Sequence, residues 1–449
     1  MGVPRESAVG GLLMAVLVAA CSTGVEKAGE PAVSASSSSP SSTPAPAPPT
    51  PAASPRSSAP SAASTGPADP PPATSAPGRT AGALPTSSSS PVTNVYAAVT
   101  AGALTGAARS ARPMVYVPNT LSDTVQLIDP RTYRVVGRWP TGREPQHVVP
   151  SWDLKTLWVN DAVGNDLVPI DARTGRAGKR VAVEDPYNLY FTPDGTHALV
   201  MAERLHRIDV RDARTMRLRR SLRVPCEGVN HADFSADGSF LVASCEFSGE
   251  LLVIDRSATR IRKVIDLNRI TTPGATSPHE ARHLHGSPKQ QLAPGASAMP
   301  QDVRLTPDGR HFLAADMLRN GVWVIDARTL RYTRFLRTGV GTHGIYPSRD
   351  AKRLFVSNRD SGSVSVLDAR TLRQLARWKV PGGGSPDMGG VSADGRELWL
   401  SGRYHSEVYV FDTVKGRLTH RIPVDAGPHG LCVWPQPGRY SLGHTGNMR

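Results

Sequence analysis

Four of the thirteen histidines of this 449-residue chain occupy nearly the same place in a recurring sequence pattern. His147 and His231 each precede the aspartate of a turn by six residues, and His343 and His429 stand in the matching strings GTHG and GPHG. If the pattern is a structural repeat, these side chains converge although they lie far apart in the sequence. Imidazole is a common metal ligand and titrates near neutral pH. The set therefore indicates either a metal or ligand site, or the ordinary polar lining of a water-filled channel.

Other side chains that could bind a ligand occupy the same place, or neighbouring loops, in the remaining copies. Cationic groups beside a ring of histidines suit an anionic ligand, although exposed loop arginines are also common on surfaces without one. The residues that we predict to form the ligand-binding set are His147, Asn188, His231, Asp302, His343, Met388, His429, Arg403 and His405.

One insertion interrupts the spacing of the pattern between His231 and Asp302. The extra residues, about 268–299, are expected over the mouth of the channel, where long loops often carry function. His279, His283 and His285 could add metal ligands to the ring below, and the alternative is a polar loop without such a role. The string HExxH at 279–283 matches that of helical zinc proteases, but no helical scaffold supports it.

The pattern itself recurs seven times between residues 114 and 449, and each copy reads as four short strands. A period of about 42 residues made of strands is typical of a propeller. The chain enters the pattern at a second strand and leaves after an extra inner strand, so the C-terminal strand is expected to complete the first blade. The sequence therefore predicts an all-β, seven-bladed propeller of four-stranded blades. Residues 93–113 are an unassigned lead-in.

The repeats resemble the YVTN-type β-propeller family of bacterial exported proteins. The matching strings are VYVPNTLSDTVQLIDPRTYRVVGRWPTGREPQHVVPS at 115–151 and LFVSNRDSGSVSVLDARTLRQLARWKVPGG at 354–383. More distantly, the repeats are similar to the haem-bearing propeller of cytochrome-type nitrite reductases. The first resemblance implies the fold, and it leaves the chemistry open because many members are binding or scaffold proteins.

The N-terminus indicates export. A positive start and the apolar run GGLLMAVLVAA at 10–20 lead to Val18-Ala19-Ala20-Cys21, which resembles the lipobox of bacterial lipoproteins. This resemblance implies cleavage before Cys21 and lipidation of its thiol; an ordinary secretory signal is the alternative. Residues 22–92 are almost entirely Ser, Pro, Ala, Thr and Gly and predict a disordered stalk. We therefore expect the protein on the outer face of the bacterial cytoplasmic membrane or in the cell envelope, held by its lipid alone.

The remaining cysteines bear on possible disulfides, and the net charge bears on possible binding partners. In an oxidising compartment Cys226 and Cys245 could form a disulfide at one end of a hairpin, whereas Cys432 reads as a buried thiol. The formal net charge is +14, mostly arginine. Nucleic-acid binding is not predicted, because no arginine cluster is interleaved with aromatic residues.

Three functions of different classes fit these observations. The preferred one is a monomeric binding module whose propeller mouth takes a protein, glycan or small ligand. The alternative is a redox enzyme or cofactor carrier in which the histidine ring holds copper, zinc or a haem-like group. The third is a structural protein of the cell envelope whose arginine-rich rim binds anionic polymer.

Overall fold

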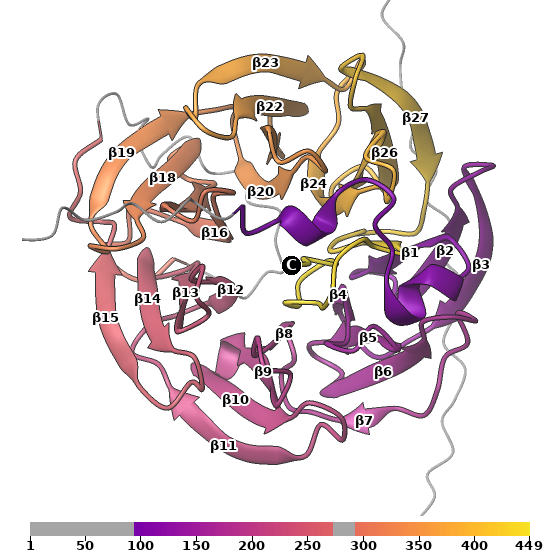
Figure 1. Cartoon of the computed structure of the whole chain (residues 1–449), viewed down its shortest axis with the longest axis horizontal. Coiled ribbons are helices and arrows are strands. Elements are labelled where there is room, and N and C mark those ends of the chain that lie inside the picture. The colour runs from indigo at the N-terminus through magenta and orange to yellow at the C-terminus, as the bar shows by residue number, and fades with distance from the viewer. Residues whose placement is uncertain (1–93, 273–291) are drawn as a thin grey trace, which may run out of the picture. The chain divides into compact units, whose positions relative to one another are not determined.

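The computed structural model of the chain describes residues 94–272 and 292–449. Their strands form seven four-stranded antiparallel sheets arranged in a ring (Figure 1). The all-β, seven-bladed propeller predicted from the sequence is confirmed. Within these residues, no helix has the length and apolar character needed to cross a membrane.

Each blade runs from an inner strand beside the central channel to an outer strand on the rim. Blades 1 to 4 consist, from inside to outside, of β28 (Cys432–Trp434), β1 (Met114–Asn119), β2 (Thr124–Asp129) and β3 (Arg134–Pro140); β4 (Pro145–Pro150), β5 (Thr156–Asp161), β6 (Asp166–Asp171) and β7 (Val181–Ala182); β8 (Asn188–Phe191), β9 (His197–Ala202), β10 (Arg207–Asp212) and β11 (Leu218–Arg223); and β12 (Val229–Phe234), β13 (Phe240–Cys245), β14 (Glu250–Asp255) and β15 (Ile261–Asp266). Blades 5 to 7 consist of β16 (Pro300–Leu305), β17 (His311–Asp316), β18 (Gly321–Asp326) and β19 (Tyr332–Arg337); β20 (Thr342–Pro347), β21 (Arg353–Asn358), β22 (Ser363–Asp368) and β23 (Gln374–Lys379); and β24 (Pro386–Val391), β25 (Glu397–Gly402), β26 (Glu407–Asp412) and β27 (Arg417–Pro423).

The burial of the strands follows their place in the blade. Every residue of the inner strand β12 is buried, whereas the outer strand β11 alternates between exposed and half-buried residues. The repeated turn after each third strand is held by its aspartate. In blade 5, Oδ1 of Asp326 accepts hydrogen bonds from the backbone nitrogen of Thr329 at 2.7 Å and from its hydroxyl at 2.8 Å. The sequence Asp-Ala-Arg-Thr thus builds a turn that caps the strand pair.

The ring of blades closes where a strand from the C-terminal part of the chain joins the first blade. Strand β28 pairs antiparallel with β1, with Val433 opposite Val115, so the C-terminal strand completes blade 1 as expected. Closure in this way removes the open sheet edges that would otherwise pair with other chains. The lead-in before β1 contains two short 3-10 helices, η1 (Ala97–Val99) and η2 (Gly106–Ser110).

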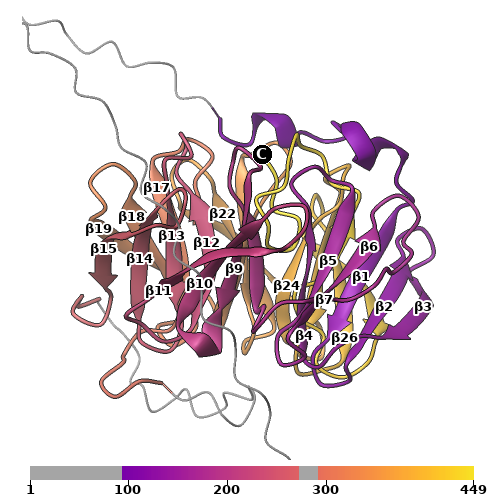
Figure 2. The ribbon, with the colours of Figure 1, turned by 90° about the horizontal axis from the view of Figure 1, so that it is seen from below.

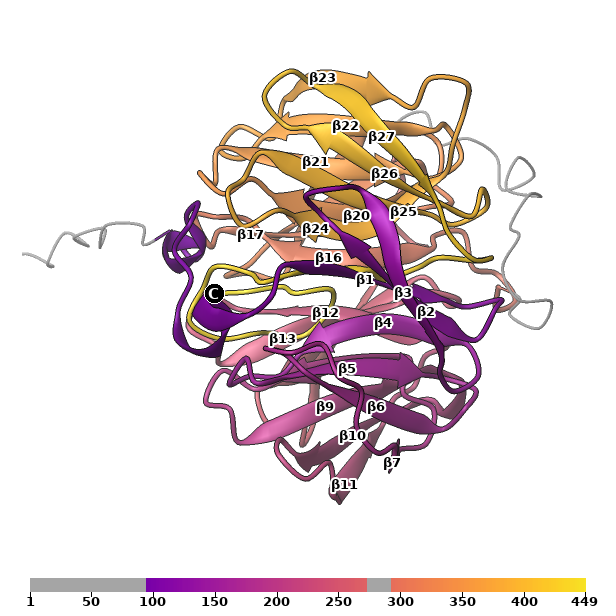
Figure 3. The ribbon, with the colours of Figure 1, turned by 90° about the vertical axis from the view of Figure 1, so that its right-hand side faces the viewer.

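The last residues of the chain form a tail that folds back into the channel. After β28, the tail passes the inner strands of other blades, and the C-terminus lies near the centre of the ring (Figure 1). The guanidinium of Arg449 donates to Asp233 Oδ1 at 2.9 Å and to the carbonyl of Phe234 at 2.7 Å. Figures 2 and 3 show the C-terminus at the same end of the propeller as η1 and η2.

Candidate metal centre

The inner strands present two successive residues, rather than one, to the channel. In blade 4, Val229 pairs with Cys245 and Ala232 with Ala243, so Asn230 and His231 together oppose Ser244. This is a β-bulge, which re-aims side chains near the end of a strand. The serine of the second strand stabilises it, since Ser244 Oγ donates to Asn230 Oδ1 at 3.0 Å and accepts from the His231 backbone nitrogen at 3.3 Å.

The same irregularity recurs at the start of the inner strands β4, β16, β20 and β24. Serines again hold it in blades 6 and 7, where Ser357 and Ser401 bond the backbone nitrogens of Gly344 and Met388. Because of these bulges, histidines at either of the two positions reach the channel. His147 and His231 use the second position of the pair, whereas His343 uses the first.

Four histidines from four blades form a closed ring of imidazoles. The ring centroids of successive members lie 5.6 Å apart for His147 and His231, 6.1 Å for His231 and His343, 6.1 Å for His343 and His429, and 4.9 Å for His429 and His147. All four side chains are buried. The four histidines that the sequence singled out therefore lie together in the structure.

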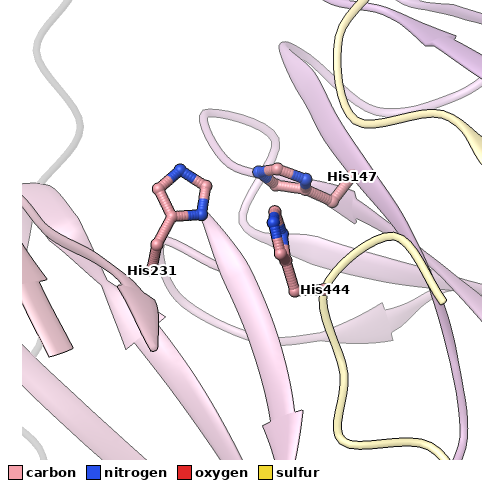
Figure 4. Close-up of side chains that lie close together, drawn as sticks. All are labelled: His147, His231 and His444. Atoms are coloured by element: carbon pink, nitrogen blue, oxygen red, sulfur yellow. The ribbon is translucent and has the colours of Figure 1, made fainter. Parts of the chain in front are cut away.

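A fifth histidine, which the repeat pattern does not predict, comes from the C-terminal tail. The centroid of His444 lies 4.7 Å from that of His231 and 5.1 Å from that of His147. Ligand nitrogens of these three residues all lie within 4.8 Å of one another, and the rings point toward one another in Figure 4. We call His147, His231 and His444 the first cluster.

Asn188 orients two rings of the first cluster. Its amide nitrogen lies 3.2 Å from Nδ1 of His231 and 3.2 Å from Nδ1 of His444. Its side-chain oxygen accepts from the backbone nitrogen of Leu189 at 2.9 Å, which fixes the amide. Nε2 of His231 and both ring nitrogens of His147 have no hydrogen-bond partner in residues 94–272 and 292–449.

A buried ion pair stands behind His444. Oδ1 of Asp302 lies 3.3 Å from His444 Nε2, and Oδ2 lies 3.1 Å from the guanidinium of Arg304. Burial acts to raise the pKa of Asp302, but the charge of Arg304 and the interactions with His444 and His231 together outweigh it, so the pKa lies below its ordinary value. Asp302 is therefore an anion that can position His444, as carboxylates behind metal-ligating histidines do.

On the other side of the channel, His343, Asp387 and His429 form a second cluster, whose ligand atoms also lie within 4.8 Å of one another. The two clusters adjoin through His147 and His429.

Burial keeps the ring imidazoles neutral. It lowers the pKa of His147, His231, His343 and His429 well below the ordinary value, and neighbouring histidines and arginines add to this effect. A neutral imidazole has a free nitrogen lone pair, which is the form that binds metals.

The remaining residues of the predicted set lie around this centre with different roles. Met388 is fully buried at the start of β24. Arg403 is half-buried, and its guanidinium donates to Thr120 Oγ1 at 2.9 Å. His405 is exposed, and its Nδ1 lies 2.9 Å from Ser385 Oγ, so it belongs to neither cluster. His279, His283 and His285 lie outside the described residues, as does Cys21.

Cys226 and Cys245 form a disulfide with a Cα–Cα distance of 6.0 Å. It joins the segment before β12 to the end of β13, beside the strand that carries His231. Cys432 is a buried free thiol, and burial raises its pKa.

Comparisons with known proteins agree with this architecture. The sequence model of YNCE-like beta-propellers matches residues 77–277 and 290–437. The chain belongs to the YNCE-like beta-propeller family. A curated member, the uncharacterized protein YncE of Salmonella typhi, is 22% identical over 284 residues, which are 62% of this chain and 74% of that protein.

Among solved structures, a functionally unknown protein from Desulfotomaculum acetoxidans has a TM-score of 0.55 at 13% identity, over 72% of this chain and 99% of that chain. The dihydro-haem d1 dehydrogenase NirN, in complex with DHE, has a TM-score of 0.49 at 15% identity, over 71% of this chain and 75% of that chain. The first of these two likenesses, at 13% identity, shows a shared fold alone.

Proposed function

We propose that this propeller is a metal-binding protein that holds one late first-row transition ion, copper or zinc, through His147, His231 and His444. The observation that carries the proposal is the convergence of three fully buried imidazoles whose ligand nitrogens lie within 4.8 Å of one another. These histidines come from two blades and from the tail, so the fold itself assembles them.

The energetics of burial support an ion at this place. A buried polar atom without a hydrogen bond costs about 1–3 kcal/mol. The first cluster contains four such nitrogens, two on His147 and one each on His231 and His444, counted among the described residues. A metal ion would take up lone pairs there and offset part of this cost. If these residues served only to pack the channel, an apolar ring, or a ring with one hydrogen bond, would cost less free energy to bury there.

The donor set narrows the identity of the ion. Neutral imidazoles suit copper and zinc, while calcium and magnesium prefer oxygen ligands. Three histidines are also the protein ligands of one type of catalytic zinc site, which keeps a fourth position open. A haem-like group, the other cofactor considered from the sequence, would have to displace rings that already lie 4.7–6.1 Å apart. A bare ion therefore fits this centre better.

The proposal keeps the expected location of the protein outside the cytoplasm. Residues 1–93, with the lipobox-like string and Cys21, lie outside the described residues. Substitution Cys21→Ala in cells is expected to move the protein from the membrane fraction to the soluble fraction. Retention in the membrane fraction would argue against the lipid anchor and would leave the metal proposal untouched.

The metal proposal is tested by titration of the chelator-treated, full-length chain with Cu(II) and with Zn(II). We expect a saturable site for at least one of these ions in the unsubstituted protein, and a large loss of affinity in His147→Gln and His231→Gln. His311→Gln is the matched control, because His311 lies at the start of β17 and outside both clusters. Equal binding by all four proteins, or no binding by any, would contradict the proposal and favour a propeller that recognises a partner without metal.

A further inference from the structure

We propose that the second cluster, His343, Asp387 and His429, binds a second divalent metal ion. Its residues come from blades 6, 7 and 1, and ligand atoms of all three lie within 4.8 Å of one another. The side chains are buried, with exposed fractions of 2% for His343, 0% for Asp387 and 1% for His429. The inference rests on the same channel as the proposed function, but it uses none of the ligands of the first cluster.

One oxygen of the Asp387 carboxylate accepts hydrogen bonds, and the other has none among the described residues. Oδ1 accepts from the guanidinium of Arg359 at 2.7 Å and 3.1 Å and lies 3.0 Å from Nδ1 of His343. Oδ2 has no hydrogen-bond partner among the described residues and lies 3.7 Å from Nε2 of His429. A buried carboxylate oxygen without a hydrogen bond, facing an imidazole nitrogen, is suited to accept a cation between them.

Arg359 is placed to orient Asp387 rather than to fill the site. Its guanidinium carbon lies 5.5 Å from the centre of the Tyr404 ring, and Nη1 donates to the Tyr404 hydroxyl at 3.2 Å. The arginine is therefore fixed on the tyrosine and holds the carboxylate through Oδ1 alone. Partners that hold a ligating carboxylate in this way commonly tune metal affinity.

The two clusters differ in donor chemistry. The first offers three imidazoles, whereas the second offers two imidazoles and a carboxylate. Two histidines with one carboxylate suit iron(II) and also zinc, which are harder than copper(I). The centroids of His147 and His429 lie 4.9 Å apart, so ions in the two clusters would be close neighbours. The channel would then hold a pair of ions with unlike ligands.

The experiment counts metal ions per chain. Full-length protein is treated with chelator, loaded with excess Co(II) as a visible probe or with Zn(II), desalted and measured for bound metal. We expect two ions per chain in the unsubstituted protein, one in Asp387→Asn, one in His231→Gln and two in the control His311→Gln. His343→Gln provides a second variant of the same cluster if Asp387→Asn fails to fold.

The outcomes separate this inference from the function proposed above. One ion in the unsubstituted protein, lost in Asp387→Asn and kept in His231→Gln, would support the second cluster while the first proposal fails. Two ions retained by both Asp387→Asn and His343→Gln would overturn the inference. So would a single ion that Asp387→Asn and His231→Gln both remove, because the channel would then hold one shared ion. No ion in any protein would leave Asp387 as an ordinary ion-pair partner of Arg359 and would overturn it as well.

Discussion

The imidazoles of His231 and His444 lie 4.7 Å apart, centroid to centroid, although one belongs to an inner strand and the other to the C-terminal tail. Asn188 contacts Nδ1 of both rings. The tail therefore does more than fill the channel, because it adds a third imidazole to the two that the inner strands supply.

Removing the tail ligand should weaken metal binding without opening the propeller. We expect His444→Gln to raise the dissociation constant for the ion of the first cluster at least about tenfold, since even outer-shell partners contribute that much. Asn447→Ala is the control from the same tail, and its side chain belongs to neither cluster. Isothermal titration of both variants measures the effect, and equal affinities would show that His444 is not a ligand.

Gly430 sets the position of His147. A Cβ atom added to Gly430 would lie 1.9 Å from Nδ1 of His147, closer than any real contact. Gly430→Ala must therefore push the ring aside, and we expect a loss of about 1–3 kcal/mol in the free energy of unfolding, as for overpacked cores, together with weaker metal binding.

Gly137→Ala provides the matched control for this substitution. Its added Cβ would meet the nearest atom, of Leu127, at 3.6 Å, which is an ordinary contact. Urea denaturation and metal titration of the two alanine variants compare them directly. If Gly430→Ala binds metal as tightly as Gly137→Ala does, the ring position of His147 does not matter for binding.

Asn188 should act on affinity without being a ligand. The amide nitrogen of Asn188 can only donate, so it occupies the Nδ1 lone pairs of His231 and His444 through which these neutral rings would bind a metal. Asn188→Ala frees these lone pairs, and we expect metal binding to strengthen about two- to tenfold, because a displaced hydrogen bond is worth about 0.5–1.5 kcal/mol. The melting temperature of the metal-free variant shows whether it is folded. A folded variant with unchanged affinity would assign Asn188 to channel lining alone.

The sequence predicted more of the fold than of the site. Repeats with a strand pattern were enough for seven blades and their closure, and the four ring histidines followed from their shared place in the repeat. Strand alternation, however, puts only every second residue on one side. The bulges at Asn230–His231 and its counterparts bring both residues to the channel, so alternation alone gives no reason to select Asp387. His444 follows the last repeat, where no periodicity locates a residue.

A pH effect on stability is expected from Asp161, which belongs to neither cluster. Burial raises the pKa of Asp161 to about 8, and the nearby Asp166 adds to this, against the hydrogen bonds from Thr141 and Gly142. Between the ordinary pKa of 3.8 and about 8, the folded state holds a proton that the unfolded state has lost. The stabilisation from this bound proton is therefore complete below the ordinary pKa. As the pH rises toward 8, the free energy of unfolding falls by about 1.4 kcal/mol per pH unit.

Asp161→Asn should remove this pH dependence, because the amide does not titrate. Urea denaturation at pH 5, 6.5 and 8 is expected to show the variant gaining stability relative to the unsubstituted protein as the pH rises. Asp153→Asn, at an exposed turn, is measured in the same series as the control substitution. A difference between Asp161→Asn and the unsubstituted protein that stays constant with pH would contradict a raised pKa of Asp161.

The most direct test of the central claim is X-ray absorption spectroscopy of the full-length protein after loading with one equivalent of copper or zinc. An ion held by His147, His231 and His444 should show nitrogen neighbours at about 2.0–2.1 Å with the scattering pattern of imidazole rings. That pattern should weaken in His231→Gln and persist in His311→Gln. A shell of oxygen neighbours without imidazole scattering, unchanged between the two variants, would contradict a metal centre in the channel.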